Sequence, residues 1–280
     1  MEKIIILIIF ALICFSLNED NNYNNDWRNY PACKLGRLQS PIEINEYESS
    51  YSNDFSFVYQ DYKNINCKIN QDQKGNYALT TEELNGGYIN FERGGVIKQY
   101  KFIKAELYPG LHKIDGDSPD YELHLVHEKN LEFKTNKNQY RSIQDPNMFL
   151  TIVLRYKKEC EGDIICTSDD GLLDNLLKEE NDAVTINLNN YPIFQDKRAY
   201  FYEGSSIHIP CDENINYYIV KDLFHTDKDS LENLPFDKLD PHDRFGRPVY
   251  KNFMNYREVM KSNVISIKIM PLLLLLLILF

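Results

Sequence analysis

Apolar and polar residues alternate in many short stretches of this chain, a period-two pattern that predicts half-buried β-strands. In ELHLVH, at 122–127, the alternation places Glu122, His124 and Val126 on one face and His127, with the intervening leucines, on the other. Stretches of this kind predict strands over 55–59, 66–70, 88–91, 101–107, 122–127, 148–156, 185–188, 207–209 and 217–220. Helical periodicity predicts one short amphipathic helix in 169–181, and a brief turn is expected in 229–240. The expected fold class is therefore mainly β (α+β).

The composition supports a single globular unit. The 280 residues are 43% apolar and 13% aromatic, enough to bury one substantial core. Because no internal repeat or linker divides the chain, we expect one domain over 18–261.

The two ends of the chain carry apolar runs that predict targeting signals. Residues 1–17 have a basic start followed by an apolar run, the layout of a cleaved secretory signal peptide. The final run, MPLLLLLLILF, is shorter than the ~20 residues that a spanning helix needs. Small or polar Ser262 and Asn263, a short spacer and the terminal apolar tail resemble a GPI-anchor signal, and we interpret 262–280 in this way. The alternative is a retained hydrophobic tail, which stays open because the spacer includes apolar Val264, Ile265 and Ile267. The expected location is extracellular, at the outer surface of a membrane through a lipid anchor.

The net charge disfavours polyanionic partners. Forty-two acidic residues against 31 basic ones give a formal charge of −11, with no basic run that could follow a phosphate backbone. We therefore expect no nucleic-acid partner and no sulfated glycan ligand.

Six cysteines are present, and Cys14 lies in the predicted signal peptide, which leaves an odd number in the mature chain. At least one thiol is therefore free or intermolecular. Cys160 and Cys166 flank EGDII, a spacing that suits a small disulfide loop, whereas a zinc site would need a second pair nearby. Cys67 lies in an alternating stretch and is predicted to be a buried thiol.

Several motifs resemble those of the α-class carbonic anhydrases, in the family's order. They are QSPIEI at 39–44, LNGGYINFERGG at 84–95, ELHLVH at 122–127, YFYEGSSIHIPCDEN at 200–214 and RFGRPVYKNFMNYR at 244–257. The resemblance covers most of the chain. It implies a large twisted, mostly antiparallel central sheet with short peripheral helices, and a disulfide between Cys33 and Cys211.

The same resemblance implies that two of the three zinc-binding histidines are missing. The upstream pair of the family falls on Glu106 and Tyr108, and only His124 remains. A carboxylate makes a metal-bound water less acidic than imidazole does, and a phenol must lose a proton near pH ~10 to bind a metal well. This pattern predicts a zinc-ligand-deficient member of the family.

The supporting residues of that site also differ. Leu111 and Ile207 stand where the family has a glutamate and a threonine that orient the metal-bound hydroxide. No histidine lies at 65–67, where the family's proton shuttle would fall. Glu122 is expected to orient His124, and His112 and His127 are expected to be structural.

These observations predict a binding or structural module that is not a CO2 hydratase, needs no cofactor, and has an unknown protein or small ligand at the former cleft. One alternative is an enzyme whose rebuilt metal site, for zinc or another ion, uses Glu106, His124 and His208. Another is recruitment of a different histidine, from His112, His127, His225 and His242.

Overall fold

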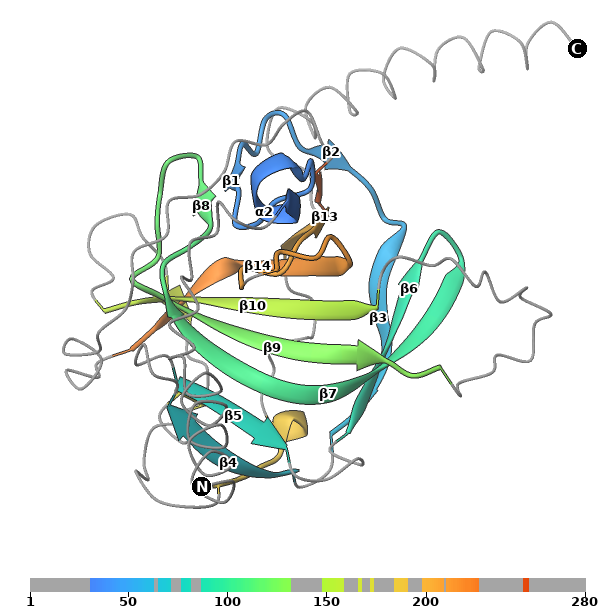
Figure 1. Ribbon diagram of the computed structural model, residues 1–280, viewed down its shortest axis with the longest axis vertical. Coiled ribbons are helices and arrows are strands. Elements are labelled where there is room, and N and C mark those ends of the chain that lie inside the picture. Colours follow the sequence, from blue (N-terminus) through green and yellow to red (C-terminus); the bar gives the residue numbers. More distant parts are fainter. Residues whose placement is uncertain are drawn as a thin grey trace, which may run out of the picture.

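β-strands dominate the computed structural model, as Figure 1 shows. It describes residues 31–62, 65–71, 77–81, 87–131, 148–158, 166–167, 172–173, 184–190, 198–208, 210–226 and 249–251. Two short helical elements lie among them, α2 (Pro31–Leu35) and the 3-10 turn η2 (Leu188–Asn190). The strands are β1 (Glu43–Ile44), β2 (Ser50–Tyr51), β3 (Phe55–Asp61), β4 (Ile65–Gln71), β5 (Tyr77–Thr81), β6 (Tyr88–Arg93), β7 (Val96–Pro109), β8 (Lys113–Ile114), β9 (Tyr121–Lys129), β10 (Phe149–Lys157), β11 (Cys166–Thr167), β12 (Val184–Ile186), β13 (Ala199–Gly204), β14 (Ile215–His225) and β15 (Tyr250–Lys251).

Within these residues, 13 strands form one curled sheet whose main path runs β12-β4-β5-β7-β9-β10-β14-β13-β15-β2. Most neighbours are antiparallel, and β10–β14 is the longest parallel pair. The 14-residue β7 pairs with β9 along one edge and with β6 and then β5 along the other. The predicted fold class, a large mostly antiparallel sheet with little helix, is confirmed.

The sheet buries side chains on both faces. Leu123 and Leu125 of β9 pack in the larger core cluster, on the face opposite His124. A second cluster, which includes Val153, Tyr202 and Tyr217, packs on the His124 face. Because both faces are covered, all seven residues from Tyr121 to His127 are buried.

Some predicted elements differ from the structure. The strand predicted at 207–209 is wrong, because Ile207 and His208 lie in a bend whose turn is closed by a 2.8 Å hydrogen bond from the Cys211 amide to the His208 carbonyl. Strands β5 and β13 were not predicted. In the segment predicted to be a helix, 169–181, the described residues Leu172 and Leu173 are helical and buried.

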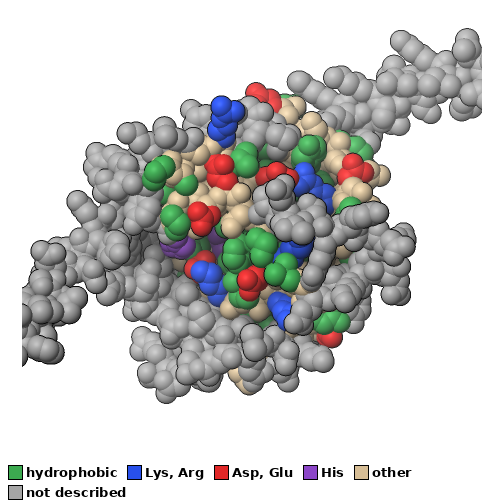
Figure 2. All heavy atoms as spheres, turned by 45° about the vertical axis from the view of Figure 1, so that its right-hand side comes forward, with side chains coloured by type: hydrophobic (Ala, Val, Ile, Leu, Met, Phe, Trp, Pro, Cys, Tyr) green, Lys and Arg blue, Asp and Glu red, His purple; other side chains and the backbone are tan. Residues whose placement is uncertain are grey.

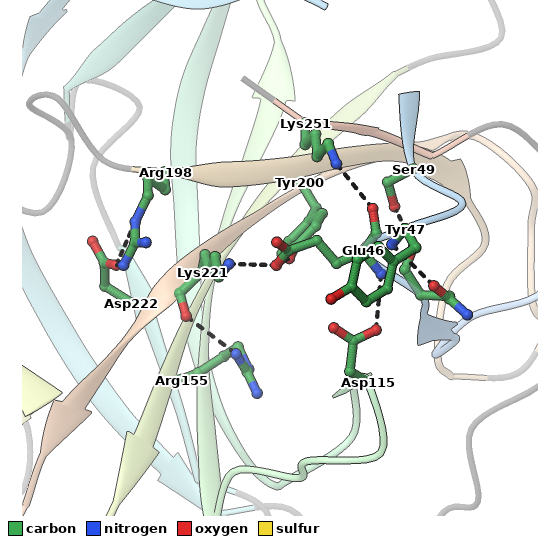
Figure 3. Close-up of polar contacts among 11 residues, drawn as sticks. Glu46, Tyr47, Ser49, Asp115, Arg155, Arg198, Tyr200, Lys221, Asp222 and Lys251 are labelled. Carbon is green, nitrogen blue, oxygen red and sulfur yellow. Dashed lines mark hydrogen bonds and ion pairs between the residues drawn. The ribbon is translucent and has the colours of Figure 1, made fainter. Parts of the chain in front are cut away.

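A polar cluster fastens the N-terminal segment to β13, β14 and β15 (Figure 3). The carboxylate of Glu46 accepts hydrogen bonds from the Tyr200 hydroxyl, at 2.7 Å, and from the Lys221 ammonium. The fully buried Lys251 donates to the Glu46 carbonyl at 2.9 Å. These contacts join residues more than 150 positions apart and hold the N-terminal segment against this part of the sheet.

Among the described residues, no helix is both long enough and apolar enough to cross a bilayer. The predicted signal peptide, the C-terminal tail, Cys160, His242 and the turn at 229–240 lie outside the described residues.

Candidate functional site

A cavity of about 330 Å³ opens on the His124 face of the sheet. Strands β7, β9, β10 and β14 form its floor, and the loop 206–214 forms its side. Alternation along β7 and β9 sends Lys104, Glu106, His124 and Val126 into it, because Glu106 and His124 are direct partners across the two strands. This cavity is the former cleft that the sequence predicts.

Glu106 is held as a carboxylate by two basic neighbours. Its Oε1 lies 2.6 Å from the Lys104 ammonium and 3.7 Å from His208 Nε2, and its side chain is only 14% exposed. Burial by itself raises the pKa of Glu106, but the contacts with His208 and Lys104 outweigh it and hold the pKa at about 2. Glu106 is therefore ionised and already partnered.

Tyr108 lies two residues further along β7 and points to the same side of the sheet. Its hydroxyl is 2.5 Å from His208 Nε2, and its ring packs 4.8 Å from the ring of His124, centroid to centroid. The phenol is buried, at 3% exposure. Tyr108 thus bridges the strand to the loop, in a position where the family resemblance implies a metal ligand.

Glu122 is a fully buried carboxylate that receives four hydrogen bonds. The amides of Leu111 and His112 donate to Oε1 at 3.2 and 2.6 Å, and His112 Nδ1 and His124 Nε2 donate to Oε2 at 2.8 and 2.9 Å. Although burial raises the pKa of Glu122, the two histidines outweigh it, and the pKa is well below the ordinary value. The carboxylate orients His124 and leaves Nδ1 as the ring nitrogen available to the cavity.

The polar chain continues from His112 away from the cavity. His112 Nε2 lies 2.7 Å from the Tyr202 hydroxyl, which donates to Ser40 Oγ at 3.1 Å. A Cβ on Gly204 would come 2.2 Å from that Oγ, so glycine is required for this approach. Both ring nitrogens of the fully buried His112 are therefore engaged within this network.

The donor set does not fit the zinc site of the family. Among the described residues, the His, Cys, Asp and Glu group whose ligand atoms lie within 4.8 Å of one another is His112, Glu122 and His124. Its carboxylate already accepts four hydrogen bonds, and Glu106 and His208 do not join His124 in such a group. A tetrahedral zinc site of the family would use neutral imidazoles at the two β7 positions. In this chain those positions carry the carboxylate of Glu106, in an ion pair, and the phenol of Tyr108, in a hydrogen bond.

The other predicted residues take separate places. Ile207 lines the cavity, and Leu111 is buried and contributes only its amide to Glu122. His127 is fully buried on the opposite face, with Nε2 2.8 Å from the Tyr62 hydroxyl. His225 ends β14, eight residues beyond the cavity-lining Tyr217 and roughly 26 Å away along an extended strand.

Lys104 is a functional residue that the sequence reasoning missed. Its position two residues before Glu106 on a strand places both side chains on one face, and this spacing could have identified the pair. Thr151 and Tyr217, which also line the cavity, carry no comparable signal in the sequence.

The predicted disulfide between Cys33 and Cys211 is present and holds the loop 206–214. Beside it, Glu213 accepts hydrogen bonds from the Leu38 amide at 2.6 Å and from Gln39 Nε2 at 3.2 Å. The loop that bears Ile207 and His208 is therefore tied to the N-terminal segment at two points.

On the surface shown in Figure 2, acidic and basic side chains are interspersed, and a histidine is exposed beside both kinds.

A curled sheet with a cleft above an ELHLVH strand defines a protein of the carbonic anhydrase fold. Comparisons with known proteins agree. The sequence profile of the eukaryotic-type carbonic anhydrases matches residues 22–267. The chain belongs to this α-class carbonic anhydrase family.

The individual relatives are distant. Alpha carbonic anhydrase 6 of Arabidopsis thaliana is 24% identical over 202 residues, which are 70% of this chain and 66% of that protein. Dioscorin dioA3 of Dioscorea japonica is 22% identical over 215 residues, 76% of this chain and 71% of that protein. A crystal structure of dioscorin complexed with ascorbate matches with a TM-score of 0.60 at 16% identity, covering 85% of this chain and 97% of that one. At this identity the structural match supports the fold alone.

Proposed function

We propose that this chain is a carbonic anhydrase-like binding or structural module that does not hydrate CO2. The observation that carries the proposal is the contact between the Tyr108 hydroxyl and His208 Nε2, at 2.5 Å. It engages Tyr108, which stands at a former ligand position, with His208 of the cavity loop, while Lys104 engages Glu106 at the other former ligand position of β7. Side chains that stabilise one another in this way have no remaining need for a metal ion.

The zinc content of the purified domain 18–261, prepared without chelator or affinity metal, tests this proposal. We expect well under one zinc per chain by elemental mass spectrometry, and no hydratase or esterase activity. Hydratase activity that a sulfonamide inhibitor abolishes and that His124→Ala removes would refute it.

A second candidate is an enzyme with a rebuilt metal site. It is supported by Glu106, His124 and His208 lining one cavity. The three side chains would have to turn to bring their ligand atoms to ~2.1 Å from a single ion. One metal per chain that survives dialysis and is lost in His208→Ala would favour this candidate.

We further propose that the module is secreted and held at the outer cell surface by a GPI anchor. This location is supported by the signal-like segment 1–17 and by the short apolar tail in 262–280. The Cys33–Cys211 disulfide also supports it, because disulfides form and persist mainly in secreted and extracellular proteins. Release of the protein from intact cells by a phosphatidylinositol-specific phospholipase would support the anchor. Retention after that treatment, or a retained C-terminal tail in the mature chain, would refute it.

A further inference from the structure

Thr151 of β10 places a hydroxyl group in the cavity. The residue lines the cavity and is only 2% exposed, and its hydroxyl makes no hydrogen bond to any described residue. Among the described residues, the fully enclosed side-chain atoms without a partner are Arg155 Nε and Asn216 Oδ1, so the Thr151 oxygen can be reached from the cavity. Because a buried hydroxyl without a partner costs free energy, this position favours a ligand that supplies one.

The immediate neighbours of Thr151 in the sheet are apolar. Its direct partners across the sheet are Val126 of β9 and Tyr217 of β14. The Tyr217 hydroxyl donates to the Ser205 carbonyl at 2.8 Å, which leaves the ring as the contribution of this residue to the cavity. Phe149 lies two residues earlier on the same face of β10 and also lines the cavity. The Thr151 hydroxyl therefore lies between hydrocarbon and aromatic surfaces.

The charged side chains of the cavity floor lie further away. Lys104 and Glu106 belong to β7, two strands from β10 and thus roughly 10 Å away at the backbone. Their side chains engage each other at 2.6 Å. A charged ligand group beside Thr151 would lose its water without a counter-charge in contact with it. A threonine hydroxyl both donates and accepts at any pH, so its need for a partner does not depend on the protonation of His124 or His208.

We infer that this cavity binds a small neutral organic molecule that carries one hydroxyl or carbonyl oxygen on an apolar body. The oxygen pairs with the Thr151 hydroxyl, and the body packs on Val126, Phe149 and the ring of Tyr217. The cavity volume of about 330 Å³ is at the lower end of the range for ligand sites, which suits a body of about one ring. This inference rests on the proposed function and deepens it, because it names the ligand class of the binding module.

Benzyl alcohol is a suitable probe, and toluene, which lacks only the oxygen, is its matched counterpart. Titration calorimetry of both ligands on the wild type and on Thr151→Val isolates the contribution of the hydroxyl. We expect Thr151→Val to weaken benzyl alcohol relative to toluene by on the order of 10-fold, because toluene leaves the hydroxyl without a partner in the wild type but not in the variant. Thr185→Val, at an exposed threonine of β12, should leave the ratio of the two affinities unchanged.

A second measurement uses the unaltered protein and covers the case in which Thr151→Val fails to fold. Bound benzyl alcohol is expected to show nuclear Overhauser contacts from its CH2 group to the Thr151 methyl group and from its ring to the Val126 methyl groups. An unchanged affinity ratio in folded Thr151→Val, bound ligand without these contacts, or tighter binding of benzoate or benzylammonium than of benzyl alcohol would overturn the inference.

Zinc content and hydratase activity of the same preparation report on the proposed function separately. One zinc per chain with hydratase activity refutes that function. Zinc-free, inactive protein whose preference between benzyl alcohol and toluene does not depend on Thr151 refutes the ligand class alone.

Discussion

Glu106 and His124 are direct partners across β7 and β9, yet each side chain is engaged by a different neighbour. Glu106 Oε1 is paired with Lys104, and His124 Nε2 donates to Glu122. The position on β9 therefore keeps an oriented imidazole, whereas the position on β7 has become part of an ion pair. One of the three ligand positions implied by the family resemblance thus retains an imidazole that a buried carboxylate orients.

This asymmetry predicts that zinc binding can be restored from β7 alone. The double variant Glu106→His, Tyr108→His should take up about one zinc per chain, because His124 is already oriented by a carboxylate. Competition with a chelator would measure the affinity. Hydratase activity should remain low, since Leu111 and Ile207 do not supply the polar groups that orient a metal-bound hydroxide, and loss of such groups typically costs 10–100-fold.

The matched control is the same double variant with His124→Ala, which should bind zinc far more weakly. A folded double variant that binds no zinc would show that the backbone positions on β7 and β9, and not only the side chains, have departed from the family's geometry.

The acid sensitivity of the fold should include a contribution from His127. Burial lowers the pKa of His127 from 6.5 to about 4, against the opposing effect of hydrogen bonds to the Leu150 and Leu125 carbonyls. The unfolded chain thus binds a proton near pH 6.5 and the folded chain only near pH 4. The stabilisation of the neutral ring is present above pH 6.5 and is lost as the pH falls toward 4, by about 3 kcal/mol in total.

Urea unfolding measured at several pH values would check this expectation. His127→Asn keeps an N–H donor near Nδ1 and removes the titration, so its unfolding free energy should fall less steeply than that of the wild type between pH 6.5 and 4. His124 contributes in the same direction, since burial also lowers its pKa, and the difference between the two proteins isolates His127. Parallel pH profiles would contradict the assignment.

The disulfide between Cys33 and Cys211 should stabilise both the fold and the cavity loop. It closes a loop of 178 positions, and the chain-entropy account predicts a loss on the order of 4–5 kcal/mol for Cys33→Ser, Cys211→Ser. Amide exchange at Ser206 and Cys211 should accelerate as well, because their hydrogen bonds lie in the released loop. Unchanged exchange with lowered global stability would show that Glu213 alone holds the loop.

The sequence predicted those strands of the sheet whose two faces differ in polarity, because polar and apolar residues then alternate along the chain. Alternation identified β9, and with it the shared face of Glu122 and His124. It missed β13 because the first four residues of this strand, AYFY, are all buried. Polar and apolar residues therefore do not alternate there. It also misplaced a strand at 207–209, because Ile207 and His208 lie in a bend of a loop that Cys211 joins by a disulfide to Cys33, 178 positions away in the chain.

For the site, the substitutions were visible in the sequence but their new partners were not. Glu106 and Tyr108 could be located by motif, and the proximity of His208 to both depends on how the 206–214 loop folds back over β7. Contacts of this kind, between residues about 100 positions apart, are set by packing and not by local pattern.

The cluster around Glu46 offers a final test, of how strongly a partly buried ion pair contributes (Figure 3). The Glu46 and Lys221 side chains are 14% and 24% exposed, and the carboxylate also accepts from Tyr200. A double-mutant cycle with Glu46→Gln and Lys221→Met should give a coupling energy of about 1–3 kcal/mol, because removing either partner leaves the other poorly solvated.

The separate ion pair of Arg198 and Asp222, also drawn in Figure 3, supplies the matched control. Their ion pair is 2.6 Å long, but the Arg198 side chain is 56% exposed, so solvent screens it and the corresponding cycle should give ~0.5 kcal/mol or less. Raising the salt concentration should weaken the Arg198 coupling more than the Glu46 coupling, since buried charges are screened less. Equal couplings, or equal salt sensitivity, would mean that Glu46 is solvated in solution. The hold of this cluster on the N-terminal segment would then depend on the Lys251 hydrogen bond to the Glu46 carbonyl.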